Sequence, residues 1–301
     1  MTRMPVQAFV VIILIQILWG GNPVAVKFGL EAFPPLWSGF LRFAAAICCL
    51  LAWAWIRKIS MWPQRGEWKP LAILGTVFFI QIWAMNYGFD LSTGAISSIL
   101  ISTHPLFAAL FAHLLVKGDR LTGIKIVGMA VAFAGTALII LRGGGLSADD
   151  FSLFGASVIM FSAIILGWRL IFASQMARRL ETTKVVCWQM LMPLWAFALG
   201  GFLFEDITWQ NDVLGSVGWL AIAGILYQGV VIAGLGFMVN TWMLSTYSPS
   251  VVVSFGFIAP LSGVAFSIWL LGEPFTWVIA IGVVCVGAGL LLIARKPKEA
   301  S

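Results

Sequence analysis

The stretch Gly118-Asp119-Arg120-Leu121-Thr122 recurs 154 residues later as Gly272-Glu273-Pro274-Phe275-Thr276. Both copies keep the glycine, the acidic residue and the threonine at the same places. Each copy leads into an apolar run that carries two glycines at matching positions, and these are Gly128, Gly135, Gly282 and Gly289. Glycines seven residues apart lie on one face of a helix, so we expect them to allow close packing between helices.

The similarity extends upstream of the motif. Asn86 and Asn240 keep the spacing of 154 residues, and Pro105 and Pro260 are 155 residues apart inside apolar runs. A repeat of this length indicates two copies of one structural unit. We therefore predict a first repeat over residues 1–145 and a second over residues 146–301.

The composition predicts a membrane protein. Of the 301 residues, 61% are hydrophobic and 10% are charged, whereas a soluble domain has about 25% charged residues. The net charge of +6 could indicate nucleic-acid binding, but the placement of the charges favours membrane topology. We therefore expect no nucleic-acid partner. The four cysteines lie in apolar runs without metal-ligand spacing, and we expect no metal and no cofactor.

Ten apolar stretches approach or exceed the roughly 20 residues that a helix needs to cross a bilayer. Because the runs are continuous rather than alternating, they predict an all-α membrane protein and not a barrel. The expected spans are Val6–Val26, Pro35–Trp55, Pro70–Phe89, Gly94–Val116, Leu121–Leu141, Ser152–Met176, Thr183–Phe204, Leu214–Leu244, Pro249–Leu271 and Phe275–Ala294. The first could be a signal peptide, but no small-residue cleavage pattern follows it.

The basic residues set the expected orientation. With the N-terminus inside, the cytoplasmic segments hold 14 of the 18 Lys and Arg residues, and the outer segments hold only Lys27 and Arg142. This asymmetry predicts that both termini lie in the cytoplasm. Five spans in each repeat, an odd number, make the second repeat inverted relative to the first. Inverted repeats are typical of transporters, whose substrate site lies near the middle of the membrane.

Two arginines lie inside the expected spans, where a charge is costly. Arg169 lies about 12 Å from the cytoplasmic end of its span and could attract an anionic group of a substrate. Arg42 lies about 10 Å below the outer end of its span, within reach of a snorkelling side chain. For both residues, an interaction with the interface or with a backbone carbonyl remains the alternative.

His104 directly precedes Pro105 in the middle of a span. Proline removes a backbone donor and opens the helix at that point, which exposes carbonyl groups. His104 could therefore bind substrate or carry a proton. The alternative is a structural histidine bonded to a neighbouring helix. Ser102, two residues before His104, is a further candidate for substrate binding. We expect Pro105 and Pro260 to mark helix breaks with a role in gating.

Other polar and aromatic residues inside the spans are further candidates for substrate binding. Trp19 and Asn22 share one helix face at a spacing of three residues, whereas Gln81 and Trp83 point in roughly opposite directions. Core packing is the alternative for the tryptophans. The remaining candidates are Asn86, Trp168 and Gln228.

The chain resembles the drug/metabolite transporter superfamily in its EamA branch, over nearly its whole length. Leu18-Trp19-Gly20-Gly21-Asn22 resembles the first helix of that family, and Pro35 followed by Arg42 and alanines resembles the second. The Pro105 and Pro260 stretches with their Gly-acid-x-x-Thr turns resemble its fourth and ninth helices.

The resemblance implies ten helices in two inverted five-helix repeats. It also implies a cavity lined by the first, third, fourth, sixth, eighth and ninth helices, and export of amino acids or other small metabolites. Trp19, Trp168 and Phe257 match aromatic cavity positions of aromatic amino-acid exporters, and Gln81 matches a polar one. Those members carry an aromatic residue before the first proline, where this chain has His104.

We therefore expect an exporter of small metabolites in a bacterial inner membrane, which works by alternating access and has lipid and a small molecule as its partners. Whether it forms a homodimer is left open by the sequence. The alternative within transport is an importer or facilitator of a vitamin or other nutrient. An intramembrane enzyme would need a catalytic set inside the spans, such as His-Glu-x-x-His or paired aspartates, and the sequence contains none.

Overall fold

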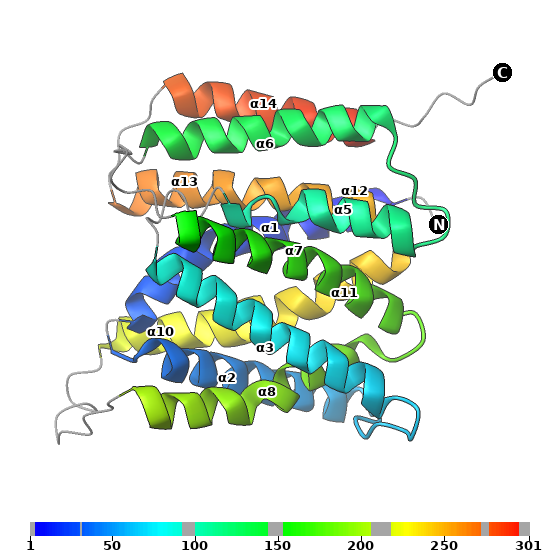
Figure 1. Ribbon diagram of the computed structural model, residues 1–301, viewed down its shortest axis with the longest axis vertical. Coiled ribbons are helices and arrows are strands. Elements are labelled where there is room, and N and C mark those ends of the chain that lie inside the picture. Colours follow the sequence, from blue (N-terminus) through cyan, green and yellow to red (C-terminus); the bar gives the residue numbers. More distant parts are fainter. Residues whose placement is uncertain are drawn as a thin grey trace. The chain divides into compact units, whose positions relative to one another are not determined.

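A computed structural model describes residues 4–30, 32–91, 100–143, 153–205, 218–271 and 277–294 of the chain, and every regular element in these ranges is a helix (Figure 1). The helices are α1 (Val6–Leu30), α2 (Pro35–Ile56), α3 (Trp68–Asp90), α5 (His104–Leu115), α6 (Gly123–Gly143), α7 (Leu153–Met176), α8 (Thr182–Phe204), α10 (Trp219–Leu226), η2 (Tyr227–Gly236), α11 (Phe237–Thr246), α12 (Pro249–Ser254), η3 (Phe255–Phe257), α13 (Ile258–Leu271) and α14 (Trp277–Ala294).

The helical prediction is confirmed for the described residues. Five segments are long and apolar enough to cross a membrane, and five shorter apolar helices accompany them. The long segments are Leu36–Ile56, Trp68–Gly88, Leu153–Met176, Thr182–Phe204 and Trp219–Thr246. The first helix continues to Leu30, four residues beyond the expected end. Part of the expected span Gly94–Val116 lies outside the described residues.

The chain divides into two compact units that do not coincide with the two predicted repeats. The first unit comprises residues 1–20, 80–171 and 243–301, and the second comprises residues 21–79 and 172–242. Each unit therefore contains helices from both halves of the sequence.

In the first unit, α6 and α14 pack side by side through their glycines (Figure 1). A Cβ added at Gly128 would lie 2.7 Å from the carbonyl oxygen of Gly289, and one added at Gly135 would lie 2.8 Å from that of Gly282. The expectation that these glycines allow close packing is confirmed. Since Gly128 faces Gly289 while Gly135 faces Gly282, the two helices run antiparallel.

In the same unit, two other helix pairs pack closely at a glycine. Gly20 of α1 lies against Ser262 and Ala259 of α13, where a Cβ would collide with both. Gly167 of α7 lies against α5, and its Cβ would be 2.8 Å from the Cβ of Phe107. These contacts bring the backbone of α1 close to that of α13 and the backbone of α7 close to that of α5.

In the second unit, α2 packs against α8 and against η2. A Cβ at Gly201 would lie 2.8 Å from Nε1 of Trp37, and one at Gly39 would lie 3.4 Å from the ring of Phe197, so α2 and α8 also run antiparallel. The carboxylate of Glu205 caps the N-terminus of α2. It accepts hydrogen bonds from the backbone N–H groups of Leu36 at 2.6 Å and Trp37 at 3.1 Å.

The eighth expected span is not a plain α-helix. Residues Tyr227–Gly236 form a π-helix between α10 and α11. Within it, a Cβ at Gly229 would lie 2.6 Å from the carbonyl oxygen of Arg42, so this turn touches the backbone of α2 directly. Wide turns of this kind occur frequently at functional sites.

Candidate functional site

Two helix breaks face one another in the first unit. The helix that contains Pro105 is interrupted by a turn at Ser102 and Thr103, directly before α5 begins at His104. The other break is the 3-10 segment η3, which separates α12 from α13 three residues before Pro260. A Cβ at Gly256 in η3 would lie 3.4 Å from Cγ of Pro105 and 3.7 Å from Nε2 of His104.

The imidazole of His104 is oriented by this geometry. Its Nδ1 lies 2.9 Å from the carbonyl oxygen of Ile101, one turn earlier, so this nitrogen carries the proton when the ring is neutral. Nε2 is then directed toward Gly256 as an acceptor. Arg169 lies close enough for its charge to act on the same ring.

Helix α7 presents polar groups to this region along one face. Ser162 and Arg169 are seven residues apart, or two turns of the helix, and both are buried. Ser162 donates a hydrogen bond to the backbone carbonyl of Gln81 at 2.9 Å and accepts one from its Nε2 at 3.3 Å. The side-chain Oε1 of Gln81 is buried with no hydrogen-bond partner in the described part of the chain, so it remains available to a donor.

The aromatic candidates are placed differently from one another. Trp19 and Trp168 are partly buried, each beside a glycine at a close helix contact. Trp83 is 50% exposed and stacks on Tyr87 with ring centroids 5.6 Å apart, so it is turned away from Gln81. Phe257 packs among apolar residues with Ala132 and Val286.

Asn86 is partly buried on α3, and Pro260 is partly buried at the start of α13. The structure thus brings His104 together with Pro105, Arg169 and the turn at Ser102, and it pairs Gln81 with Ser162. Trp83 and Phe257 are not part of that polar group.

The remaining two candidates lie in the second unit. Gln228 is fully buried at the start of the π-helix, where its Nε2 donates to the carbonyl oxygen of Ala25 at 3.0 Å. Its Oε1 accepts from Nη1 of Arg42 at 3.4 Å. Asn22 lies one turn before Ala25 on the same helix, and its Oδ1 is buried without a hydrogen-bond partner among the described residues.

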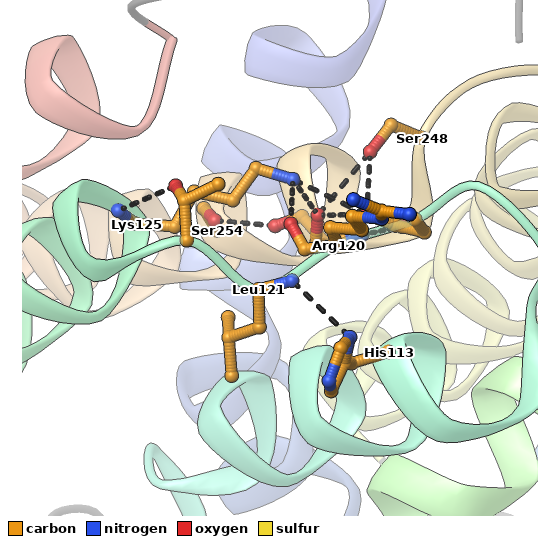
Figure 2. Close-up of polar contacts among 9 residues, drawn as sticks. His113, Arg120, Leu121, Lys125, Ser248 and Ser254 are labelled. Carbon is orange, nitrogen blue, oxygen red and sulfur yellow. Dashed lines mark hydrogen bonds and ion pairs between the residues drawn. The ribbon is translucent and has the colours of Figure 1, made fainter. Parts of the chain in front are cut away.

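The repeated motif contributes a buried carboxylate, that of Asp119, although this residue lies between two of the expected spans. Asp119 accepts hydrogen bonds from the backbone N–H of Ser250 at 2.8 Å, from its hydroxyl at 2.5 Å and from the hydroxyl of Ser248 at 3.0 Å. Lys125 forms an ion pair with it at 3.2 Å. Figure 2 shows Lys125, Ser248 and Ser254 gathered around this network. The acidic residue therefore fixes the start of α12, the helix that leads into the break at η3.

Two segments of the chain match the model of one protein family. The EamA-like transporter family matches residues 7–141 and again residues 153–295. The chain belongs to the EamA-like transporter family. As an EamA protein it is a membrane transporter and not an enzyme, and the predicted resemblance is confirmed.

Relatives of this EamA chain carry transporter names. A probable amino-acid metabolite efflux pump of Salmonella typhimurium is 24% identical, over 93% of this chain and 92% of its own length. An uncharacterized inner membrane transporter of Escherichia coli K12 is also 24% identical, over 98% and 95%. A solved crystal structure of 19% identity matches with a TM-score of 0.82, covering 95% of this chain and 98% of the other, which shows the shared fold.

Proposed function

We propose that this EamA protein is an inner-membrane exporter of small polar metabolites, with amino acids among them, and that it works by alternating access. The observation that carries the proposal is the pair of facing helix breaks, where His104 points an acceptor at the backbone of η3. Discontinuous helices with exposed polar groups form the substrate sites of many transporters. A buried polar group inside an apolar helix is costly unless it serves such a purpose.

Two antiparallel helix pairs support an architecture of ten helices in two inverted repeats. The motif and its glycines make α6 and α14 the corresponding last helices of the repeats, and α2 and α8 correspond as the second ones. Corresponding helices that run antiparallel are expected when the second repeat is inverted. The crossed contacts of Gly128 with Gly289 and of Gly135 with Gly282 are also those expected for a two-fold relation between the repeats.

A further contact agrees with the same relation. Gly229 lies 154 residues after Gly75, so the two glycines occupy corresponding positions in the repeats. Gly229 packs against α2 and Gly75 packs against α8, and these two helices also correspond to one another. A Cβ at Gly229 would lie 2.7 Å from the Cβ of Ala45 in α2, and one at Gly75 would lie 2.9 Å from the Cβ of Met192 in α8. This arrangement supports the proposed repeats over residues 1–145 and 146–301, and the distribution of Lys and Arg supports the proposed cytoplasmic location of both termini.

In the proposed site, His104 and Gln81 form hydrogen bonds with the substrate, and Arg169 attracts its anionic group. Trp19 and Trp168 provide flat apolar surfaces beside them. Phe257 packs with Ala132 and Val286 and so anchors η3 beside the site. Export as the direction is supported by the efflux-pump name of the Salmonella relative.

Transport by purified protein in liposomes tests this function. Counterflow of labelled amino acids, organic acids, nucleosides and vitamins is measured with and without a pH gradient. We expect exchange of at least one class, and we expect Gly256→Leu to abolish it by filling the space beside His104. Gly256→Ala is the matched control, because its Cβ has ordinary contacts of 3.4 Å and beyond.

Two results would count against the proposal. Counterflow of none of these compounds by the wild-type protein contradicts the transport function itself. Unchanged transport of every substrate by Arg169→Gln removes Arg169 from the site but leaves the function in place.

A further inference from the structure

The second unit contains a buried polar group built from three helices. Gln228 uses both ends of its amide, donating to α1 at Ala25 and accepting from α2 at Arg42. The close contact of Gly229 with the backbone of Arg42 holds these groups at a fixed separation. The amide of Gln228 therefore cannot turn away from the guanidinium without breaking its bond to Ala25.

Within the described ranges of the chain, the guanidinium of Arg42 has little compensation for its charge. Its Nη1 bonds a neutral amide at 3.4 Å, and its carbon lies 4.5 Å above the ring of Phe43. Its Nε is buried and has no hydrogen-bond partner among the residues that the structure describes. In those residues the two ion pairs join Lys125 to Asp119 and Lys184 to Glu67, so neither balances Arg42. A buried cation is costly unless an anion accompanies it.

The three polar residues lie at similar depths along their helices. Arg42 is seven residues from the first residue of α2, or about 10 Å. Gln228 is nine residues from the start of α10, or about 13 Å, and Asn22 is eight residues from the end of α1, or about 12 Å. The proposed topology assigns all three of these helix ends to the outer face. The group is thus within the membrane, in its outer half.

We propose that Arg42 forms a second binding site for the carboxylate of the transported metabolite, in addition to Arg169, in the outer half of the membrane. Gln228 is a positioning residue that aims the guanidinium, and the free acceptor of Asn22 suits an ammonium or hydroxyl group on the same molecule. This inference rests on the proposed transport function and names its substrate class as small carboxylates, including α-amino acids. An arginine fork matches the two oxygens of a carboxylate and so discriminates it from a neutral amide.

A substitution in the ligand-free protein tests the charge argument. Gln228→Glu places a carboxylate where the structure has a neutral oxygen beside Arg42. Because glutamate loses the hydrogen bond to Ala25 in either background, the comparison between backgrounds isolates the charge. We expect the melting temperature in detergent to fall by several degrees less in the wild-type background than in the Arg42→Gln background. An equal fall in both backgrounds would mean that a carboxylate beside Arg42 stabilises nothing, and it would overturn the proposal.

The ligand itself is tested by thermal shift with L-amino acids paired with their amides, such as L-leucine and L-leucinamide. We expect the wild-type protein to prefer the carboxylate by roughly tenfold or more, and Arg42→Gln to show a clearly smaller preference, because only Arg169 then remains to attract the anion. Gln228→Glu should show a smaller preference as well, because its own carboxylate occupies the guanidinium. Arg57→Gln is the matched control, since Arg57 is an exposed arginine at the end of the same helix.

Different results would contradict the role of Arg42 and the transport function. If Arg42→Gln keeps the full preference for the carboxylate, the assignment of Arg42 is wrong while the transport function stands. If the wild-type protein neither binds nor exchanges any compound of the panel, the proposed function fails, and the melting temperatures of the Gln228→Glu variants still decide whether Arg42 lacks an anion.

Discussion

Replacement of Asp119 by asparagine is expected to destabilise the protein, because it removes the charge that holds the start of α12. The side chain of Asp119 is fully buried, and that of its partner Lys125 is 14% exposed. Asparagine keeps the shape of the side chain but turns one acceptor into a donor. One of the hydrogen bonds from Ser250 or Ser248 is then lost, and Lys125 loses its counter-ion.

The size of the effect follows from these contacts. Breaking a buried ion pair by removing one partner costs about 3–5 kcal/mol. Lys125 keeps the hydroxyl of Ser250 at 2.6 Å and the carbonyl oxygen of Arg120 at 3.0 Å, so we expect the lower end of that range. For a chain of 301 residues, a loss of about 3 kcal/mol corresponds to a decrease in melting temperature of about 5 °C.

Tryptophan fluorescence of the purified protein in detergent measures this decrease. Arg120→Gln is the control, because its side chain is exposed and only its backbone carbonyl takes part in the network. In the double variant Asp119→Asn with Lys125→Gln, we expect a loss smaller than the sum of the two single losses. A melting temperature of Asp119→Asn within about 1 °C of the control would refute the reasoning that this carboxylate fixes α12.

Three further predictions concern other contacts. Glu205→Ala removes the carboxylate that bonds the first N–H groups of α2, and it should cost about 1 kcal/mol in a chemical or thermal unfolding series. Gly128→Ala should cost about 1–3 kcal/mol, since its Cβ collides with α14, whereas Gly287→Ala should be neutral or stabilising because nothing lies within 4 Å of its Cβ; equal stability of the two variants would contradict the packing. The pKa of Glu67 is lowered from its usual 4.5, first by the hydrogen bond from the backbone N–H of Gln64 and then by Lys184. The ionised carboxylate of Glu67 therefore stabilises the protein fully above pH 4.5, and this contribution is lost as the pH falls below that value. Between about pH 6 and pH 4, the melting temperature should decrease more for the wild-type protein than for Glu67→Gln.

The repeated motif and its glycines made the packing of α6 on α14 predictable. Glycines at matching positions in two apolar runs are typical of helices that pack closely, because a glycine lets two backbones approach. The sequence pattern therefore indicates the contact directly. The span lengths were predictable for the same reason, since hydrophobic length is a local property of the chain.

The polar contacts were not predictable, because they depend on which helices meet. Asp119 belongs to the repeated motif, but its partners Ser248 and Ser250 lie about 130 residues away, and no periodicity indicates them. The bond between Arg42 and Gln228 likewise needs the π-helix, whose hydrogen-bond pattern leaves no signature in hydropathy.

The direction in which the tryptophan and phenylalanine candidates face was not predictable from the sequence either. An aromatic residue within a span can face substrate, core or lipid with the same local sequence. The opposite directions of Gln81 and Trp83 followed from helix geometry, but only the fold shows that Gln81 is the buried one. Phe257 matched a cavity position by resemblance, yet in the structure it packs in an apolar cluster with Ala132.

The central claim is that the space beside the two helix breaks opens to either face of the membrane in turn. Labelling of Gly256→Cys by a membrane-impermeant thiol reagent tests it most directly, in a protein whose Cys48, Cys49, Cys187 and Cys285 are replaced by alanine. The account predicts labelling from both faces, in whole cells and in inside-out vesicles, with protection by transported substrate. Labelling from one face only under every condition, or from neither face, would contradict it.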